Sequence, residues 1–113
     1  MDESNEIQRE ILKKLSCILD KTTKLDFPFG SSQRIKKVII VEKKLHMENC
    51  IKKIVPEYFP SKDVLEKIWE ESVKYADEQF KPLSEKNRLN GFYLQEIMHC
   101  YVEKICQEIL DNI

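Results

Sequence analysis

FYLQEIMHCYVEKICQEILDNI, residues 92–113, is the stretch that decides the fold. At about 100° of rotation per residue, its apolar side chains fall on one half of a helical cylinder; they are Leu94, Ile97, Met98, Tyr101, Val102, Ile105, Ile109 and Ile113. Polar side chains fill most of the other half. This pattern predicts a core-facing amphipathic helix of about six turns, along which other helices pack.

Two earlier stretches show the same periodicity. Residues 5–20 gather one apolar face, formed by Ile7, Ile11, Leu12, Leu15, Ile18 and Leu19. Residues 62–80 gather another, formed by Val64, Leu65, Ile68, Trp69, Val73, Tyr75, Ala76 and Phe80. Ser61 precedes the second stretch as an N-cap, with Asp63 in the first turn. Both stretches are predicted helices, and we expect their apolar faces to be consumed by one another and by the last helix.

The stretch RIKKVIIVEKKLHMENCIKKIV, residues 34–55, has a less regular pattern. Read as helix, it groups Ile35, Val38, Ile39 and Leu45 on one side. Met47, Cys50, Ile51, Ile54 and Val55 then fall nearly opposite, and the phase slips near His46. Two helical pieces, or one helix buried on different sides at its two ends, satisfy this pattern, with Ser31 or Ser32 as the cap. A short strand over 35–41 is the alternative, because Val38–Val41 is β-branched.

Proline and glycine separate these elements. Phe27-Pro28-Phe29-Gly30 cannot continue a helix, and Pro56-Glu57-Tyr58-Phe59-Pro60 ends the next element. Residues 84–89 have the length of a single helical turn, ended by Asn90-Gly91. The aromatic side chains of the first two connections either cap the ends of the bundle or serve as anchors for a partner.

Composition supports the same fold class. The chain has 113 residues, which is the size of one domain, with 42% hydrophobic and 35% charged residues. Only two glycines leave little material for hairpin turns. The sequence therefore predicts an all-α domain over residues 1–113, built as an irregular bundle of four or five helices with short connections.

The N-terminal residues, the longest apolar run and the cysteine spacing together predict the cellular compartment. The N-terminal residues MDESNEIQRE are acidic and polar, unlike a signal or transit peptide. The longest apolar run, Val38–Val41, is too short to span a bilayer. None of the four cysteines forms a C-x-x-C pair. We expect a soluble cytoplasmic or nuclear protein with free thiols and no membrane partner.

Charge is unevenly distributed although the net charge is only −1. Residues 31–55 carry seven basic and two acidic side chains, whereas residues 56–113 carry seven basic and twelve acidic ones. The two halves attract one another in one interpretation. In the other, the basic 31–55 segment neutralises phosphates and the aromatic rings of Phe27 and Phe29 stack on bases, so nucleic-acid binding is the alternative function.

Candidate metal and catalytic groups do not converge in the sequence. His46 and Cys50 lie one helical turn apart, but a structural zinc site needs four ligands, and His99, Cys100 and Cys106 do not share one edge of their helix. Glu96 and His99 match one copy of the Glu-x-x-His motif, of which di-iron bundles need two. His99 adjoins Cys100, but neighbouring residues on a helix do not face each other, and no glycine-rich loop exists to shape an oxyanion site. We expect no metal, no cofactor and no enzymatic activity.

An interaction module without catalytic activity, acting as an adaptor or subunit, is therefore the predicted function. The expected partner-binding residues are those that the helical stripes leave out, together with neighbouring basic groups: Phe27, Phe29, Arg34, Lys36, Lys37, Ile40 and Met47. Such a surface suits an acidic, hydrophobic segment of another protein. A homodimer through the last helix is a further alternative.

Overall fold

The computed structural model of the chain describes residues 3–22, 30, 32–79 and 91–112. Within these ranges the chain forms four α-helices: α1 (Glu3–Thr22), α2 (Gln33–Ile54), α3 (Lys62–Gln79) and α4 (Gly91–Asp111). The predicted all-α fold is confirmed, and the described residues contain no strand. Residues 35–41 lie inside α2, so the alternative of a short strand there is wrong. The predicted turn at 84–89 lies outside the described residues.

Two serine caps fix where helices begin. The Ser32 hydroxyl accepts a hydrogen bond of 3.2 Å from the backbone N–H of Ile35, which identifies the N-cap of α2. The Ser61 hydroxyl accepts from the N–H of Val64 at 3.4 Å, as predicted for α3. Each cap satisfies a backbone donor that the first helical turn leaves without a partner.

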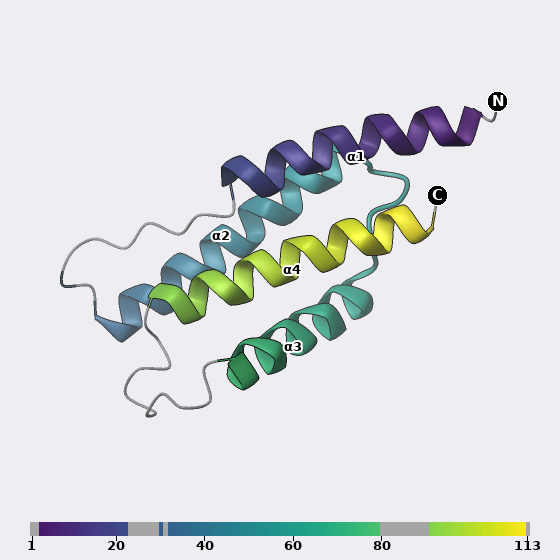
Figure 1. The fold of residues 1–113 in the computed structure, drawn as a ribbon. Helices are drawn as coiled ribbons and strands as arrows, with labels where there is room; N and C mark the ends of the chain where they lie inside the picture. The colour runs from purple at the N-terminus through teal and green to yellow at the C-terminus, as the bar shows by residue number, and fades with distance from the viewer. Residues whose placement is uncertain (1–2, 23–29, 31, 80–90, 113) are drawn as a thin grey trace.

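The helices form an elongated bundle of 53 × 25 × 22 Å in which consecutive helices run in opposite directions (Figure 1). α4 packs against α1, α2 and α3, while α1 and α2 also pack against each other. Among the described residues, α3 makes backbone contact with no helix other than α4. The prediction that other helices pack along the C-terminal helix is confirmed, and this central position explains the breadth of its apolar face.

The core is built mainly from α4, which contributes ten buried side chains: Tyr93, Leu94, Ile97, Met98, Cys100, Tyr101, Val102, Ile105, Cys106 and Ile109. Among the described residues, α1 adds one buried apolar side chain, α2 adds three and α3 adds two; they are Leu15, Ile40, Met47, Ile51, Ile68 and Ala76. Ser72 of α3 is also completely buried, and its hydroxyl donates to the carbonyl oxygen of Ile68 at 2.8 Å. Small side chains at Ser72 and Ala76 share one face and let α3 approach α4 closely.

Long side chains bridge the space between α2 and α3, whose backbones do not touch. The Tyr101 hydroxyl donates to Glu48 Oε1 of α2 at 2.6 Å, and the ring of Trp69 of α3 meets Tyr101 edge-on at 4.9 Å. Lys44 Nζ of α2 lies 4.8 Å from the centre of the Trp69 ring, a cation–π contact. The contacts among these four side chains connect α2, α3 and α4.

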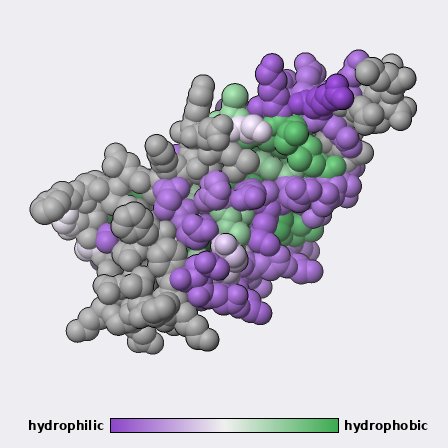
Figure 2. Space-filling view, in the orientation of Figure 1, coloured by the Kyte–Doolittle hydropathy of each residue, from purple (hydrophilic) through white to green (hydrophobic). Residues whose placement is uncertain are grey.

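α1 is less completely buried than its sequence predicts. Leu15 is buried, but Ile7 and Leu12 are 47% and 49% exposed. The N-terminal end of α1 extends beyond the ends of the other helices (Figure 1), so the apolar side chains there are only partly covered. The expectation that the three apolar stripes fully consume one another is therefore wrong for this end of α1. Apolar side chains are visible beside α4 in Figure 2, where polar side chains cover its outward face.

Candidate functional site

The structure buries part of the surface that the sequence predicted for a partner. Ile40 is 7% exposed and Met47 is fully buried, so the prediction that these two side chains remain on the surface is wrong. Together with Ile51 they fall within about 40° of arc on one face of α2, which is the face that packs into the core. The phase slip expected near His46 is not observed, because one buried face continues from Ile40 through Met47 to Ile51.

The remaining predicted residues have different environments. Arg34 and Lys37 are exposed near the start of α2, and Lys36 is half-buried. Phe27 and Phe29 lie outside the described residues. In the second aromatic connection, Phe59 packs against the core, whereas Tyr58 is 36% exposed. The structure thus keeps Arg34 and Lys37 together on the surface and separates them from Ile40 and Met47.

A continuous apolar stripe lies on the opposite side of α2 from its buried face. Its members are Ile35, Val38, Val41 and Leu45, whose side chains are 49%, 53%, 54% and 55% exposed. Val38, Val41 and Leu45 fall within about 60° of arc, and their centre lies roughly 130° from that of Ile40, Met47 and Ile51. We call Ile35, Val38, Val41 and Leu45 the outer face of α2. Half of the large apolar residues that are exposed in the described structure belong to it.

The outer face has basic residues at both ends. Arg34 precedes Val38 by four residues, Lys37 precedes Val41 by four, and Lys52 follows Leu45 by seven, which places each near the stripe. All three are exposed. Glu42 is the one exposed acidic residue of α2 among those described. The outer face therefore combines an apolar centre with a predominantly basic rim.

These basic side chains are not neutralised within the described chain. The ion pairs present there join Lys104 to Glu71 at 3.7 Å and His99 to Glu103 at 3.5 Å, and neither involves α2. Arg34 and Lys37 also stand near the positive end of the α2 helix dipole, where the first turn contains no acidic residue. Among the described residues, no ion pair joins the basic 31–55 segment to residues 56–113.

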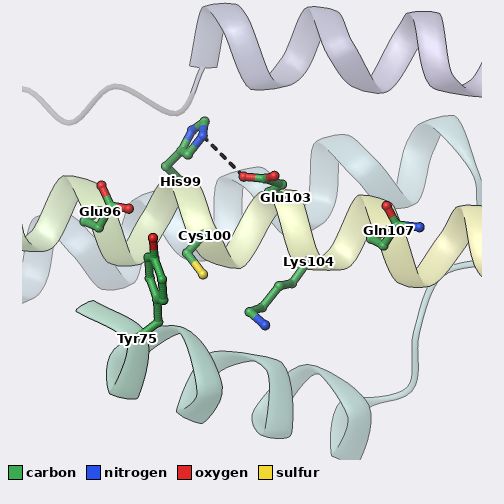
Figure 3. Close-up of a pocket in the computed structure, with 7 residues that line it drawn as sticks. All are labelled: Tyr75, Glu96, His99, Cys100, Glu103, Lys104 and Gln107. Atoms are coloured by element: carbon green, nitrogen blue, oxygen red, sulfur yellow. Dashed lines mark ion pairs between the residues drawn. The ribbon is translucent and has the colours of Figure 1, made fainter. Parts of the chain in front are cut away.

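A shallow pocket of about 350 Å³ lies between α3 and α4. Tyr75 and Lys104 extend across this space, and His99 pairs with Glu103 on the outer side of α4 (Figure 3). Cys100 and His99 both line the pocket, but Cys100 is buried and His99 points away from Cys100 (Figure 3). No nucleophile and base meet here. The Glu96 and His99 pair, the single Glu-x-x-His motif, lies on this polar side of α4.

The histidine and cysteine side chains form one close pair. Cys50 Sγ and His46 Nε2 lie 3.6 Å apart on α2. Within the described part of the chain, no group of three or more His, Cys, Asp or Glu side chains is arranged to hold a metal ion. All four cysteines are free thiols. Burial, with a smaller contribution from the nearby Glu103 carboxylate, raises the pKa of the Cys106 thiol to about 11. Such a thiol is a poor nucleophile near neutral pH.

Comparisons with known proteins place no constraint on this site. No family model matches the chain, and no curated protein or solved structure is significantly similar to it. None of the described helices has the length and apolar character needed to cross a membrane. The outer face of α2 is thus identified as the candidate site from its own exposure and charge. The sequence periodicity grouped Ile35, Val38 and Leu45 on one side of a helix, but it could not show whether that side is buried or exposed.

Proposed function

We propose that this protein is an intracellular interaction module, an adaptor or subunit without catalytic activity, that binds another protein through the outer face of α2. The observation that supports this proposal is the row of four large apolar side chains, each about half exposed, on a helix whose other side is buried. Single exposed apolar residues are common on protein surfaces, but a contiguous row with a polar rim is typical of binding sites. The cytoplasm or nucleus is the proposed location.

The size of this surface suits a reversible interaction. Fully burying a Val, Leu or Ile side chain contributes about 1.5–3 kcal/mol, so burying the exposed half of each would contribute roughly 1 kcal/mol per residue. Four such residues supply on the order of 4 kcal/mol, which association costs of similar or larger size offset in part. Polar contacts at the rim must therefore add to the affinity, and the complex is expected to be transient rather than obligate.

Nucleic-acid binding is the second candidate, and the exposed basic residues of α2 favour it. Arg34, Lys37 and Lys52 could each neutralise a phosphate. However, the stripe between them is aliphatic, and aliphatic side chains offer neither stacking nor hydrogen bonds to bases. Single charges around an apolar centre are better matched by a protein surface.

Affinity capture from the source cells, with and without nuclease, tests this proposal. The bait is the full chain, compared with an outer-face variant carrying Val38→Ser and Leu45→Ser. A matched control carries Ile7→Ser and Leu12→Ser, which alter equally exposed apolar residues of α1. We expect proteins retained by the wild type and the control to be lost from the outer-face variant, with no effect of nuclease. Nuclease-sensitive capture would favour nucleic acid, and unchanged capture by the outer-face variant would refute the docking surface.

A further inference from the structure

The charge around the outer face of α2 limits which molecules can occupy it. Lys37 and Arg34 lie at the end of α2 where the helix dipole favours acidic side chains, so their positive charge is destabilising within the isolated domain. No ion pair with the rest of the described chain compensates for this. A ligand that brings negative charge to this end of α2 would relieve the unfavourable interaction. The electrostatic complement of the outer face is therefore acidic.

A second copy of this chain does not provide that complement. The outer face of another α2 has the required apolar stripe, but it brings the same basic residues and would be repelled. The exposed side of α3 has the required acidic residues, such as Glu66, Glu70 and Glu78, but Tyr75 is its one large exposed apolar residue. Residues 6–14 of α1 carry two large exposed apolar side chains, but two exposed acidic and three exposed basic side chains surround them, so this surface is not acidic either.

An anionic membrane surface is also a poorer match than a protein. The outer face has aliphatic side chains and no aromatic residue, whereas helices that lie in the membrane interface typically carry Trp or Phe among their apolar residues. Glu42 is exposed four residues after Val38, at the edge of the stripe, where it would face lipid headgroups of the same sign. A partner of fixed shape can place its acidic groups away from Glu42, which a lipid surface cannot do.

We infer that the outer face of α2 binds an acidic amphipathic helix of a partner protein, an inference that rests on the function proposed above. The stripe from Ile35 to Leu45 extends over about 15 Å, or three helical turns. A partner helix of similar length meets it with apolar residues spaced three and four apart. Acidic residues beside that stripe lie against Arg34 and Lys37 at one end and against Lys52 at the other.

Selection from a displayed library of helical peptides of about 18 residues tests this inference without assuming a partner. The full chain serves as the target, and the Val38→Ser, Leu45→Ser variant serves for counter-selection. We expect the selected peptides to combine an apolar stripe with acidic flanks, and to bind the outer-face variant about ten-fold or more weakly than the wild type. The Ile7→Ser, Leu12→Ser control should bind them as the wild type does.

Charge reversal then tests the basic rim. Arg34→Glu with Lys37→Glu places acidic residues where the helix dipole favours them, so the fold is retained. This variant should bind the selected peptides about ten-fold or more weakly, and the wild-type affinity should fall as salt rises. Lys13→Glu with Lys14→Glu, two exposed positions on α1, is the matched control and should leave binding unchanged.

The possible failures are distinguishable. If the selected peptides depend on Val38 and Leu45 but carry basic or neutral flanks, the docking surface stands and the acidic partner is refuted. If no peptide distinguishes the wild type from the outer-face variant, the docking surface and the proposed function both fail. A concentration-dependent dimer in sedimentation that Leu45→Ser abolishes would instead identify a second copy as the occupant. Retention by phosphatidylserine vesicles that requires Val38 and Leu45 would identify a membrane.

Discussion

α4 and α2 are nearly equal in length, yet they use their apolar residues in different ways. α4 lies among the three other helices, and its apolar side chains are buried against α1, α2 and α3. α2 has two apolar faces, one buried through Met47 and Ile51 and one exposed through Val38 and Leu45. A domain of this size has one core, so it can bury only one face of each peripheral helix. The second apolar face of α2 is therefore left outside the core, and the proposed binding role rests on it.

The largest expected effect tests the difference between the two helices directly. Ile105→Asp introduces an unpaired charge at a fully buried position of α4, and we expect it to lower the free energy of unfolding by more than about 4 kcal/mol. Val41→Asp on the outer face of α2 should change it by less than about 0.5 kcal/mol. Urea denaturation followed by circular dichroism measures both. Equal effects at the two positions would show that the outer face is part of the core.

A smaller effect distinguishes the two faces of α2. Met47→Ala removes a fully buried side chain and should cost about 2–5 kcal/mol. Leu45→Ala removes a side chain that is already half exposed and should change stability by about 0.5 kcal/mol or less. Both residues have similar volume and lie two positions apart, so each serves as the control for the other. If Leu45→Ala were the more destabilising of the two, Leu45 rather than Met47 would lie in the core.

Alkaline pH should lower the free energy of unfolding through titratable groups that are buried on α4. The Cys106 thiol has its pKa raised from the ordinary value of 9.0 to about 11, so between these values the unfolded chain releases a proton that the folded chain keeps. The free energy of unfolding should therefore decrease as pH rises from 9 toward 11, by at most about 1.4 kcal/mol per pH unit. Burial and the hydrogen bond to Glu48 also raise the pKa of Tyr101, which extends the decrease to higher pH.

Urea denaturation at several pH values between 8 and 11 measures this dependence. Cys106→Ala should reduce the slope of stability against pH, although it also lowers stability at neutral pH by removing a buried side chain. Cys17→Ala, at an exposed position of α1, should leave the slope unchanged. A Cys106→Ala protein with the wild-type slope would show that the thiol does not contribute.

The smallest perturbation is thiol labelling of the native protein. Near neutral pH, a maleimide should modify the exposed Cys17 first, while the buried Cys100 and Cys106 react only on unfolding. Mass spectrometry after proteolysis assigns the modified residues. Rapid modification of Cys106 in the folded state would mean that α4 is less enclosed than its contacts with three helices indicate.

The same comparison shows how far the sequence could predict the structure. The segments that became α3 and α4 have one apolar face each, so periodicity identified both the helices and their buried sides. For α2, periodicity identified two apolar groups and could not choose between them, because that choice depends on how neighbouring helices dock. The sequence pattern grouped Ile35 with Leu45 and left Ile40 and Met47 for a partner surface, whereas the structure exposes the first pair and buries the second.

Ser72 was missed for a related reason. A serine in a helix is normally assigned to the polar side, but here its small side chain allows close packing of α3 on α4 and its hydroxyl is satisfied by the Ile68 carbonyl. Of the predicted site, Arg34 and Lys37 are exposed as expected, because basic residues at the start of a helix rarely pack inside. The apolar part could not be predicted without knowing which side of α2 faces α4.

The position of α4 in the chain also affects how the protein is made. The helix that all three others contact is the last of the four to be synthesised. A ribosome adds about 5–20 residues per second, so α1, α2 and α3 exist for seconds before α4 is available. During that interval the apolar sides of α2 and α3 have no central helix to cover them. The domain therefore cannot complete its folding until α4 has been synthesised, and before then the nascent chain offers chaperones an apolar surface that the folded domain conceals.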